Sequence, residues 1–182
     1  YRIAICSLNS VSSSKALEGE FRHSKYISLS PDSNTIVSHD GDLVKMWDLT
    51  SFAKKQEFKT PNLQKVKSLA VSDDGQYIFI GTCMDSTHVW HLESQEFVCQ
   101  LNNLISMHHR RFAIDTKNKF IISIDHKEGK YLKAWNYYTG QELWCVDASS
   151  YSIEAIMSIA FEENSNRLLI HSAIGQIVLL DI

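Results

Sequence analysis

The chain has 182 residues, of which 44% are hydrophobic and 21% are charged, and its net charge is −3. This is the composition of a globular protein that can bury a sizeable core. Acidic and basic residues are interspersed, which disfavours a nucleic-acid partner, because nucleic-acid-binding domains usually carry a basic face. No apolar run approaches the roughly 18 residues of a membrane-spanning helix, so we expect no membrane association.

The first residues, Tyr1-Arg2-Ile3, show neither an initiator methionine nor the layout of a signal peptide. We therefore expect the sequence to be an excerpt from a longer chain. Its four cysteines have no Cys-x-x-Cys spacing, and we expect free thiols in a reducing compartment. This predicts an intracellular protein, cytoplasmic or nuclear. The cysteines are Cys6, Cys83, Cys99 and Cys145.

Four strand-like segments recur along the chain at a nearly constant spacing. Three contain Trp47, Trp90 and Trp135, and the fourth has Leu180 at the same place, with steps of 43, 45 and 45 residues. A polar turn such as Ser30-Pro31-Asp32 precedes each of these positions by 17 to 20 residues. A fixed period of this size indicates one repeated supersecondary unit of four short strands, which predicts a β-propeller.

These segments resemble the WD-repeat, or β-transducin repeat, family. Met46-Trp47-Asp48-Leu49 contains the dipeptide that gives the family its name, and Trp90-His91, Trp135-Asn136 and Leu180-Asp181 resemble degenerate copies. The Gly-His pair that usually opens a repeat is missing, so the resemblance is to a divergent member. It implies an all-β fold with four WD-like repeats of four-stranded antiparallel blades and a partial N-terminal blade, as part of a larger propeller.

In chain order, the repeats divide this single propeller segment into one partial blade and four further blades. Residues 1–24 form the partial blade, with an outer strand expected from Ser14 to Phe21. The blades that follow cover 25–64, 65–107, 108–152 and 153–182, and the last lacks an outer strand. In each first strand a large residue precedes a small one, and we expect the two columns to face opposite sides and let blades interlock. The pairs are Ile27 and Ser28, Leu69 and Ala70, Phe112 and Ala113, and Ile159 and Ala160.

In the WD-repeat family, a Trp, a Ser or Thr, an Asp and a His form a hydrogen-bonded structural tetrad in each blade. Because buried polar groups need partners, we expect the matching residues here to stabilise the blades. No elbow motif presents a serine nucleophile, and no histidine pair has zinc-ligand spacing, so we expect no catalytic residue, no cofactor and no metal site. The tetrad candidates are Trp47, Ser38 and Asp40; Trp90, Thr82 and Asp85; and Trp135, Ser123 and Asp125.

Members of this family bind partners through the loops that open a repeat and the loops between its second and third strands. The resemblance places both kinds of loop on one rim, and loops on a rigid scaffold often carry function. The turns at Asp32, Asp74, Lys117 and Asn164 are expected on the opposite rim. The candidate partner-binding residues are His23, Lys65, His108, Arg110, Asp40, Asp85, His126 and Lys127.

We therefore predict a non-catalytic protein–protein interaction scaffold whose partners are other proteins, with further blades of the same chain or a larger complex as additional partners. One alternative is a sensor or autoinhibitory propeller attached to a nucleotide-switch protein. Another is a quinoprotein-type propeller, as an enzyme or a scaffold. Residues Ala134 to Trp144 resemble the docking motif Ala-x-Asp-x-x-Thr-Gly-x-x-x-Trp of quinoproteins, but the motif occurs once, and Thr139-Gly140 is also an ordinary turn signal.

Overall fold

The computed structural model describes residues 4–7, 10–17, 26–40, 42–60, 63, 66–83, 86–102, 104, 112–124, 130–153, 155–162 and 166–182, with the backbone alone for 4–7 and 10–16. The described elements are seventeen strands and one turn of 3₁₀-helix, η1 (Ala148–Tyr151). The strands are β1 (Ala4–Ser7), β2 (Ser10–Ala16), β3 (Tyr26–Leu29), β4 (Thr35–Asp40), β5 (Leu43–Asp48), β6 (Lys54–Lys59), β7 (Val66–Val71), β8 (Tyr77–Thr82), β9 (Ser86–His91), β10 (Phe97–Asn102), β11 (Phe112–Asp115), β12 (Phe120–Ile124), β13 (Tyr131–Asn136), β14 (Glu142–Asp147), β15 (Ile156–Glu162), β16 (Arg167–Ser172) and β17 (Ile177–Asp181).

Strand pairing divides the described residues into five successive antiparallel sheets. A two-stranded sheet, β1–β2, is followed by three four-stranded meanders, β3–β6, β7–β10 and β11–β14, and by the three-stranded meander β15–β17. We refer to the last four as sheets 1 to 4. Every strand pairs only with its neighbours in sequence, so each sheet is built from local contacts.

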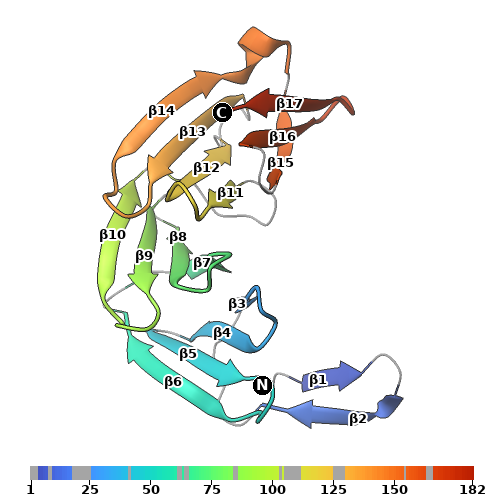
Figure 1. Ribbon diagram of the computed structural model, residues 1–182, viewed down its shortest axis with the longest axis vertical. Coiled ribbons are helices and arrows are strands. Elements are labelled where there is room, and N and C mark those ends of the chain that lie inside the picture. Colours follow the sequence, from blue (N-terminus) through green and yellow to red (C-terminus); the bar gives the residue numbers. More distant parts are fainter. Residues whose placement is uncertain are drawn as a thin grey trace.

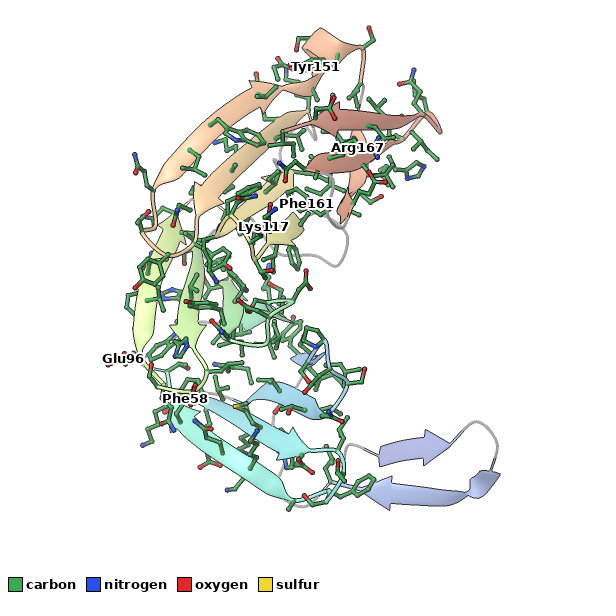
Figure 2. The ribbon with its side chains drawn as sticks, viewed as in Figure 1. Phe58, Glu96, Lys117, Tyr151, Phe161 and Arg167 are labelled. Atoms are coloured by element: carbon green, nitrogen blue, oxygen red, sulfur yellow. The ribbon has the colours of Figure 1, made fainter. Side chains whose placement is uncertain are left out.

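The sheets follow one another around an open, C-shaped arc (Figure 1). The first strands β3, β7, β11 and β15 lie along the inside of the arc, and the last strands β6, β10 and β14 lie along its outside. Lys117 and Phe161 point toward the inside, whereas Glu96 lies at the outer edge (Figure 2). Sheet 4 and the β1–β2 hairpin lie at opposite ends of the arc. The architecture is therefore an all-β, propeller-like succession of sheets.

The polar turn predicted from the sequence closes the first hairpin of sheets 1 and 2. In sheet 1, the Ser30 hydroxyl donates to the carboxylate of Asp32 and accepts from the backbone N–H of Thr35 at 2.9 Å. In sheet 2, Ser72 and Asp74 form the same arrangement. These side chains satisfy backbone groups that would otherwise remain unpaired at the strand ends.

We call the face that a sheet turns toward the preceding sheet its leading face and the opposite face its trailing face; sheets 2 and 3 pack on both faces. On the leading face of sheet 2, Leu69 and Trp90 pack against Val37, Met46 and Phe58 of sheet 1. All five side chains are buried. Burial of such apolar side chains stabilises the junction by about 1.5–3 kcal/mol each.

The trailing face of sheet 2 packs against sheet 3 in the same way. Ala70 and Phe79 of sheet 2 share a buried cluster with Ile121 and Trp135 of sheet 3. Leu69 and Ala70, which are adjacent in sequence, thus serve two different junctions, as the column pattern predicts. Sheets 3 and 4 meet through a third cluster.

The partial blade differs from its expected boundaries. An outer strand was expected from Ser14 to Phe21, but β2 runs from Ser10 to Ala16 and pairs with β1. The hairpin is short because the register shifts at Ser7, where it pairs directly with Ser10.

Among the described residues, no helix has the length and apolar character needed to span a bilayer.

Candidate interaction surfaces

The strand ends form two rims. Turns between first and second strands and between third and fourth strands form what we call the turn rim. The loops that open each repeat and the loops between second and third strands form the loop rim. Asp32 and Asp74 border one pocket of about 250 Å³, and Asp73 and Lys117 border another of about 230 Å³. The turns at Asp32, Asp74 and Lys117 thus follow one another along the turn rim, whereas the fourth expected member, Asn164, lies outside the described residues.

Most residues predicted on the loop rim lie outside the described residues, and their role there stays a prediction. Asp40 is the described member of the set. The others are His23, Lys65, Asp85, His108, Arg110, His126 and Lys127, and the tetrad candidates Asp85 and Asp125 also lie outside the described part.

Asp40 is buried instead of presented to a partner. It is 8% exposed, and its carboxylate Oδ2 lies 3.1 Å from Nζ of Lys45 on the adjacent strand. A buried carboxylate that lost this cation would carry an uncompensated charge. The expectation that Asp40 contacts a partner is therefore corrected: it belongs to a buried ion pair of sheet 1.

Among the described residues, the Ser38 hydroxyl does not make the hydrogen bond expected of it in the tetrad of sheet 1. Trp47 is fully buried, and Ser38 lies on the same face, two positions along β4 from Ile36, which pairs with Trp47. The Ser38 hydroxyl nevertheless has no hydrogen-bond partner among the described residues. Lys45 is directly opposite Ser38 and extends to the carboxylate of Asp40.

In sheet 2, the expected hydrogen bond between Trp90 and Thr82 is also absent. Trp90 is buried, but its indole Nε1 has no partner in the described part of the chain. Thr82 instead contacts Ser86, with 2.9 Å between the hydroxyls. The register explains the difference: Trp90 pairs with Ile78, which is four positions from Thr82, on the order of 13 Å along the strand. In β8, the position equivalent to Ser38 of β4 is occupied by Ile80, which has no polar side chain.

Sheet 3 keeps the arrangement of sheet 1. Trp135 pairs with Ile121, and Ser123 lies two positions along β12, opposite Lys133. Trp135 and Ser123 are both buried. Trp135 and Ser123 therefore occupy the same paired positions in sheet 3 as Trp47 and Ser38 do in sheet 1.

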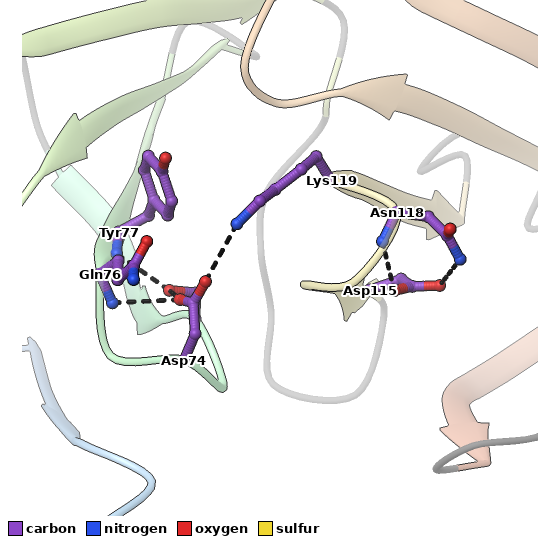
Figure 3. Close-up of polar contacts among 7 residues, drawn as sticks. Asp74, Gln76, Tyr77, Asp115, Asn118 and Lys119 are labelled. Atoms are coloured by element: carbon purple, nitrogen blue, oxygen red, sulfur yellow. Dashed lines mark hydrogen bonds and ion pairs between the residues drawn. The ribbon is translucent and has the colours of Figure 1, made fainter.

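A polar contact that the sequence analysis missed joins sheets 2 and 3 on the turn rim (Figure 3). Lys119 Nζ of sheet 3 lies 3.1 Å from Oδ2 of Asp74 in sheet 2. The same ammonium group lies 5.1 Å from the ring centroid of Tyr77 and 5.9 Å from that of Tyr137. Although burial raises the pKa of Asp74, the hydrogen bonds from Ser72, Gln76 and Lys119 lower it by more, so the carboxyl stays ionised.

Two exposed aromatic side chains border a groove beside this contact. Phe97 of sheet 2 is 49% exposed and Tyr138 of sheet 3 is 62% exposed. The groove between them has a volume of about 560 Å³, and its floor includes Tyr77 and Val98. Phe97 is held by an edge contact with the buried Trp90, at 5.4 Å between ring centroids. The groove is completed by His91, Ser94 and Glu96.

The segment that resembles a quinoprotein docking motif forms a turn. Thr139 and Gly140 connect β13 to β14, and Gly140 donates its backbone N–H to the carbonyl of Asn136 at 2.8 Å. Gly140 has φ +78°, and Phe52 and Gln95 have φ +62° and +61° in the corresponding turns of sheets 1 and 2. The glycine thus supplies a left-handed conformation that all three sheets require.

The described side chains show no cluster of three or more His, Cys, Asp or Glu residues that could hold a metal ion. Cys83, Cys99 and Cys145 form no disulfide bond with one another. Burial raises the pKa of Cys99 to about 11, and its sulfur contacts the carbonyl of Tyr137. Cys99 therefore behaves as a packing residue at the junction of sheets 2 and 3.

The fold and its rims define a repeated all-β protein of propeller-like form. No protein-family model matches the chain, and no curated protein matches it. Among solved structures, 1366 chains are similar. One is the crystal structure of the computationally designed Ika4 protein, with a TM-score of 0.62, 18% identity, and coverage of 91% of this chain and 95% of that chain. At this identity the likeness shows the fold alone.

Proposed function

We propose that this chain is a non-catalytic protein-interaction scaffold, built from WD-repeat-like propeller blades that belong to a larger ring. The equivalence of the sheets supports the ring, because the trailing faces of sheets 1 and 2 meet the next sheet through the same paired positions. In sheet 1, Val37 pairs with Met46, and in sheet 2, Phe79 pairs with Val89. All four side chains are buried at a junction.

The groove between Phe97 and Tyr138 carries the proposal of a protein partner. Exposed aromatic side chains are enriched at protein interfaces, because they offer large apolar areas at a small entropic cost. Here Phe97 begins strand β10, and Tyr138 lies in a short turn whose backbone N–H groups bond to the side chain of Asn136, so binding need not order a long loop. The partner that fits is a peptide or loop with an apolar side chain that inserts between the rings and a basic group near Glu96.

The loop rim is a second contact face, proposed from the WD-repeat resemblance. Its basic members include Lys65 and Arg110. Charged residues at the edge of an interface mainly set the association rate and specificity, whereas buried aromatic or Arg anchors carry affinity. Arg110 is the residue on this rim most suited to an anchor role.

Affinity capture from a cell lysate, followed by reconstitution with the purified partner, tests the proposal. We expect Tyr138→Ala together with Phe97→Ala to weaken the partner by more than about 1 kcal/mol, a five-fold loss or greater. Arg110→Ala tests the loop rim in the same assay. Lys117→Ala, on the turn rim but outside the groove, is the control and should bind like the parent protein.

The variants must first show the thermal unfolding of the parent. If Lys117→Ala abolishes capture while Arg110→Ala and the groove variant bind normally, both proposed contact faces are wrong. If the parent protein captures no partner, and turns over a redox substrate with bound quinone, the scaffold function itself is wrong.

A further inference from the structure

Sheets 1, 2 and 3 can be compared position by position on the turn rim, because one backbone hydrogen bond recurs in all three. The residue after the third strand donates its N–H to the carbonyl of the residue before the second strand, at 2.8, 2.8 and 3.0 Å. Lys119 of sheet 3 therefore corresponds to Gln76 of sheet 2. Asp74 corresponds to Asp32 of sheet 1, since each carboxylate accepts a hydrogen bond from the serine two residues before it. The recurring bonds join Leu49 to Asn34, Leu92 to Gln76 and Tyr137 to Lys119.

At the junction of sheets 2 and 3, these positions hold the ammonium group of a lysine. Nζ of Lys119 lies 3.1 Å from Oδ2 of Asp74 (Figure 3). It also lies 5.1 Å and 5.9 Å from the ring centroids of Tyr77 and Tyr137. A carboxylate and two aromatic rings all favour a cation, so the junction itself shows what this arrangement of positions binds.

At the junction of sheets 1 and 2, the corresponding positions carry smaller, uncharged side chains. Thr35 begins the second strand of sheet 1, where sheet 2 has Tyr77. Leu92 follows the third strand of sheet 2, where sheet 3 has Tyr137, and Gln76 precedes the second strand. A pocket of about 250 Å³ lies at this junction, and both Thr35 and Leu92 line it. The smaller side chains thus leave open a space that larger ones fill at the next junction.

The pocket combines apolar walls with a carboxylate. Val37 of sheet 1 and Val71 of sheet 2 are buried side chains that line it. Asp32 lines it as well, and hydrogen bonds from Ser30 and Asn34 hold the pKa of its carboxyl below the ordinary value. The carboxyl is therefore ionised at neutral pH.

The charges around the pocket leave room for a further cation. Besides Asp32, the pocket is lined by Asp73, Asp74 and Lys55. Asp74 is already paired with Lys119, which leaves two carboxylates against the single ammonium group of Lys55. Lys55 is exposed, so its charge is largely screened by solvent. An apolar pocket with an excess of negative charge is complementary to a cation on an aliphatic chain.

We propose that this pocket binds a lysine side chain of a partner protein, with the aliphatic chain against the valines and the ammonium group beside Asp32. The partner's lysine would take the place that Lys119 takes at the next junction. The pocket shares no lining residue with the groove between Phe97 and Tyr138. It is therefore a separate site, and its test does not depend on the partner proposed for that groove.

The test uses Nα-acetyl-lysine methylamide, which presents the lysine side chain on a peptide-like backbone. It is titrated into the whole, ¹⁵N-labelled chain at constant ionic strength, and amide shifts are followed by NMR. Saturable shifts should appear at pocket residues such as Gly75 and Leu92, with a Kd on the order of millimolar. The norleucine derivative, which keeps the apolar chain but lacks the ammonium group, should bind at least about five-fold more weakly.

Two matched substitutions test the role of the carboxylate. Asp32→Asn keeps the turn oxygen but removes the charge, and it should weaken binding by about three- to five-fold, the range for an exposed ion pair. Asp115→Asn is the control, because Asp115 also accepts hydrogen bonds within its turn but lies outside the pocket. It should bind like the parent protein. Equal losses in the two variants, or equal binding of the norleucine derivative, would overturn the proposal.

A third variant uses the equivalence of the sheets directly. Gln76→Lys places a lysine at the position of Lys119, and its own ammonium group should fill the pocket and abolish binding of the probe. Spectra with the dispersion of the parent show that each variant is folded. Unchanged binding by Gln76→Lys, or shifts in the parent that NaCl alone reproduces, would show that no lysine site exists here.

Discussion

Lys119 and Asp74 form an ion pair across the junction of sheets 2 and 3, with 3.1 Å between Nζ and Oδ2. They are 45 residues apart in sequence, one repeat, and each lies in the first turn of its own sheet. The contact helps to fix the relative position of two sheets whose shared core is mostly apolar. It therefore adds directional specificity to a junction that is otherwise held by non-directional burial.

We expect Lys119→Met to lower the free energy of unfolding by about 1 kcal/mol, through loss of the ion pair and of the cation–π contact with Tyr77. A double-mutant cycle with Asp74→Asn should give a coupling energy of about 0.5 kcal/mol that falls as NaCl is raised. Urea denaturation measures both. Lys117→Met, in the same turn, should be silent; an equal effect would show that the loss is not specific to the pair.

The carboxyl of Asp74 should also make stability dependent on acid pH. Its pKa is lowered in the folded protein, because hydrogen bonds from Ser72, Gln76 and Lys119 outweigh the opposing effect of burial. A lowered folded pKa contributes stability that is fully present above the ordinary pKa of about 3.9 and is lost as pH falls below it. Unfolding free energy measured from pH 6 to pH 3 should fall more steeply for the parent protein than for Asp74→Asn. Parallel curves would contradict this assignment.

Two substitutions of Trp90 can separate the contribution of side-chain volume to stability from that of hydrogen bonding. Trp90→Ala should cost about 3–5 kcal/mol, the range for truncation of a large buried aromatic residue. Trp90→Phe should cost well under half as much, because the indole Nε1 makes no hydrogen bond to a described residue and its removal leaves no group unpaired. Urea denaturation monitored by circular dichroism tests both variants. A cost for Trp90→Ala below about 1 kcal/mol would contradict its burial.

Replacement of Gln95 by glycine should stabilise the folded protein. Its φ is +61°, a conformation that costs a side-chain-bearing residue about 1–2 kcal/mol, and the equivalent turn of sheet 3 has Gly140. Gln95→Gly should raise the free energy of unfolding by a few tenths to about 1 kcal/mol, after the entropy cost of glycine is included. Gly140→Gln should do the reverse by a larger amount, because a Cβ there would lie 3.3 Å from Cβ of Cys99. Chemical denaturation that shows Gln95→Gly to be destabilising would exclude strain at this turn.

The fold was accessible from the sequence because its determinants are local. The turn residues Ser30 and Asp32 are close in sequence, and strand β3 ends at Leu29, directly before the polar turn that the sequence predicts. The opposite-facing roles of Leu69 and Ala70 follow from strand geometry alone.

The side-chain partnerships were less accessible, because they depend on loop lengths and on packing between sheets. The assignment of Thr82 to Trp90 came from the WD-repeat pattern, and the loop between the second and third strands varies in length among the repeats. The true rung is fixed by pairing from the other end of the hairpin, where Trp90 meets Ile78. The pairing of Lys119 with Asp74 has no signal within one repeat, since it requires the offset between two sheets.

The strictly sequential pairing of the strands also determines how the protein would respond to mechanical force. No strand is held between two that lie far apart in sequence, so tension on the two ends of the chain peels one sheet away while the others stay folded. Extension would then proceed in separate steps, each releasing about 45 residues or roughly 150 Å of chain. Each sheet would unfold at its own force, and a stretched molecule would refold one sheet at a time when the tension is released.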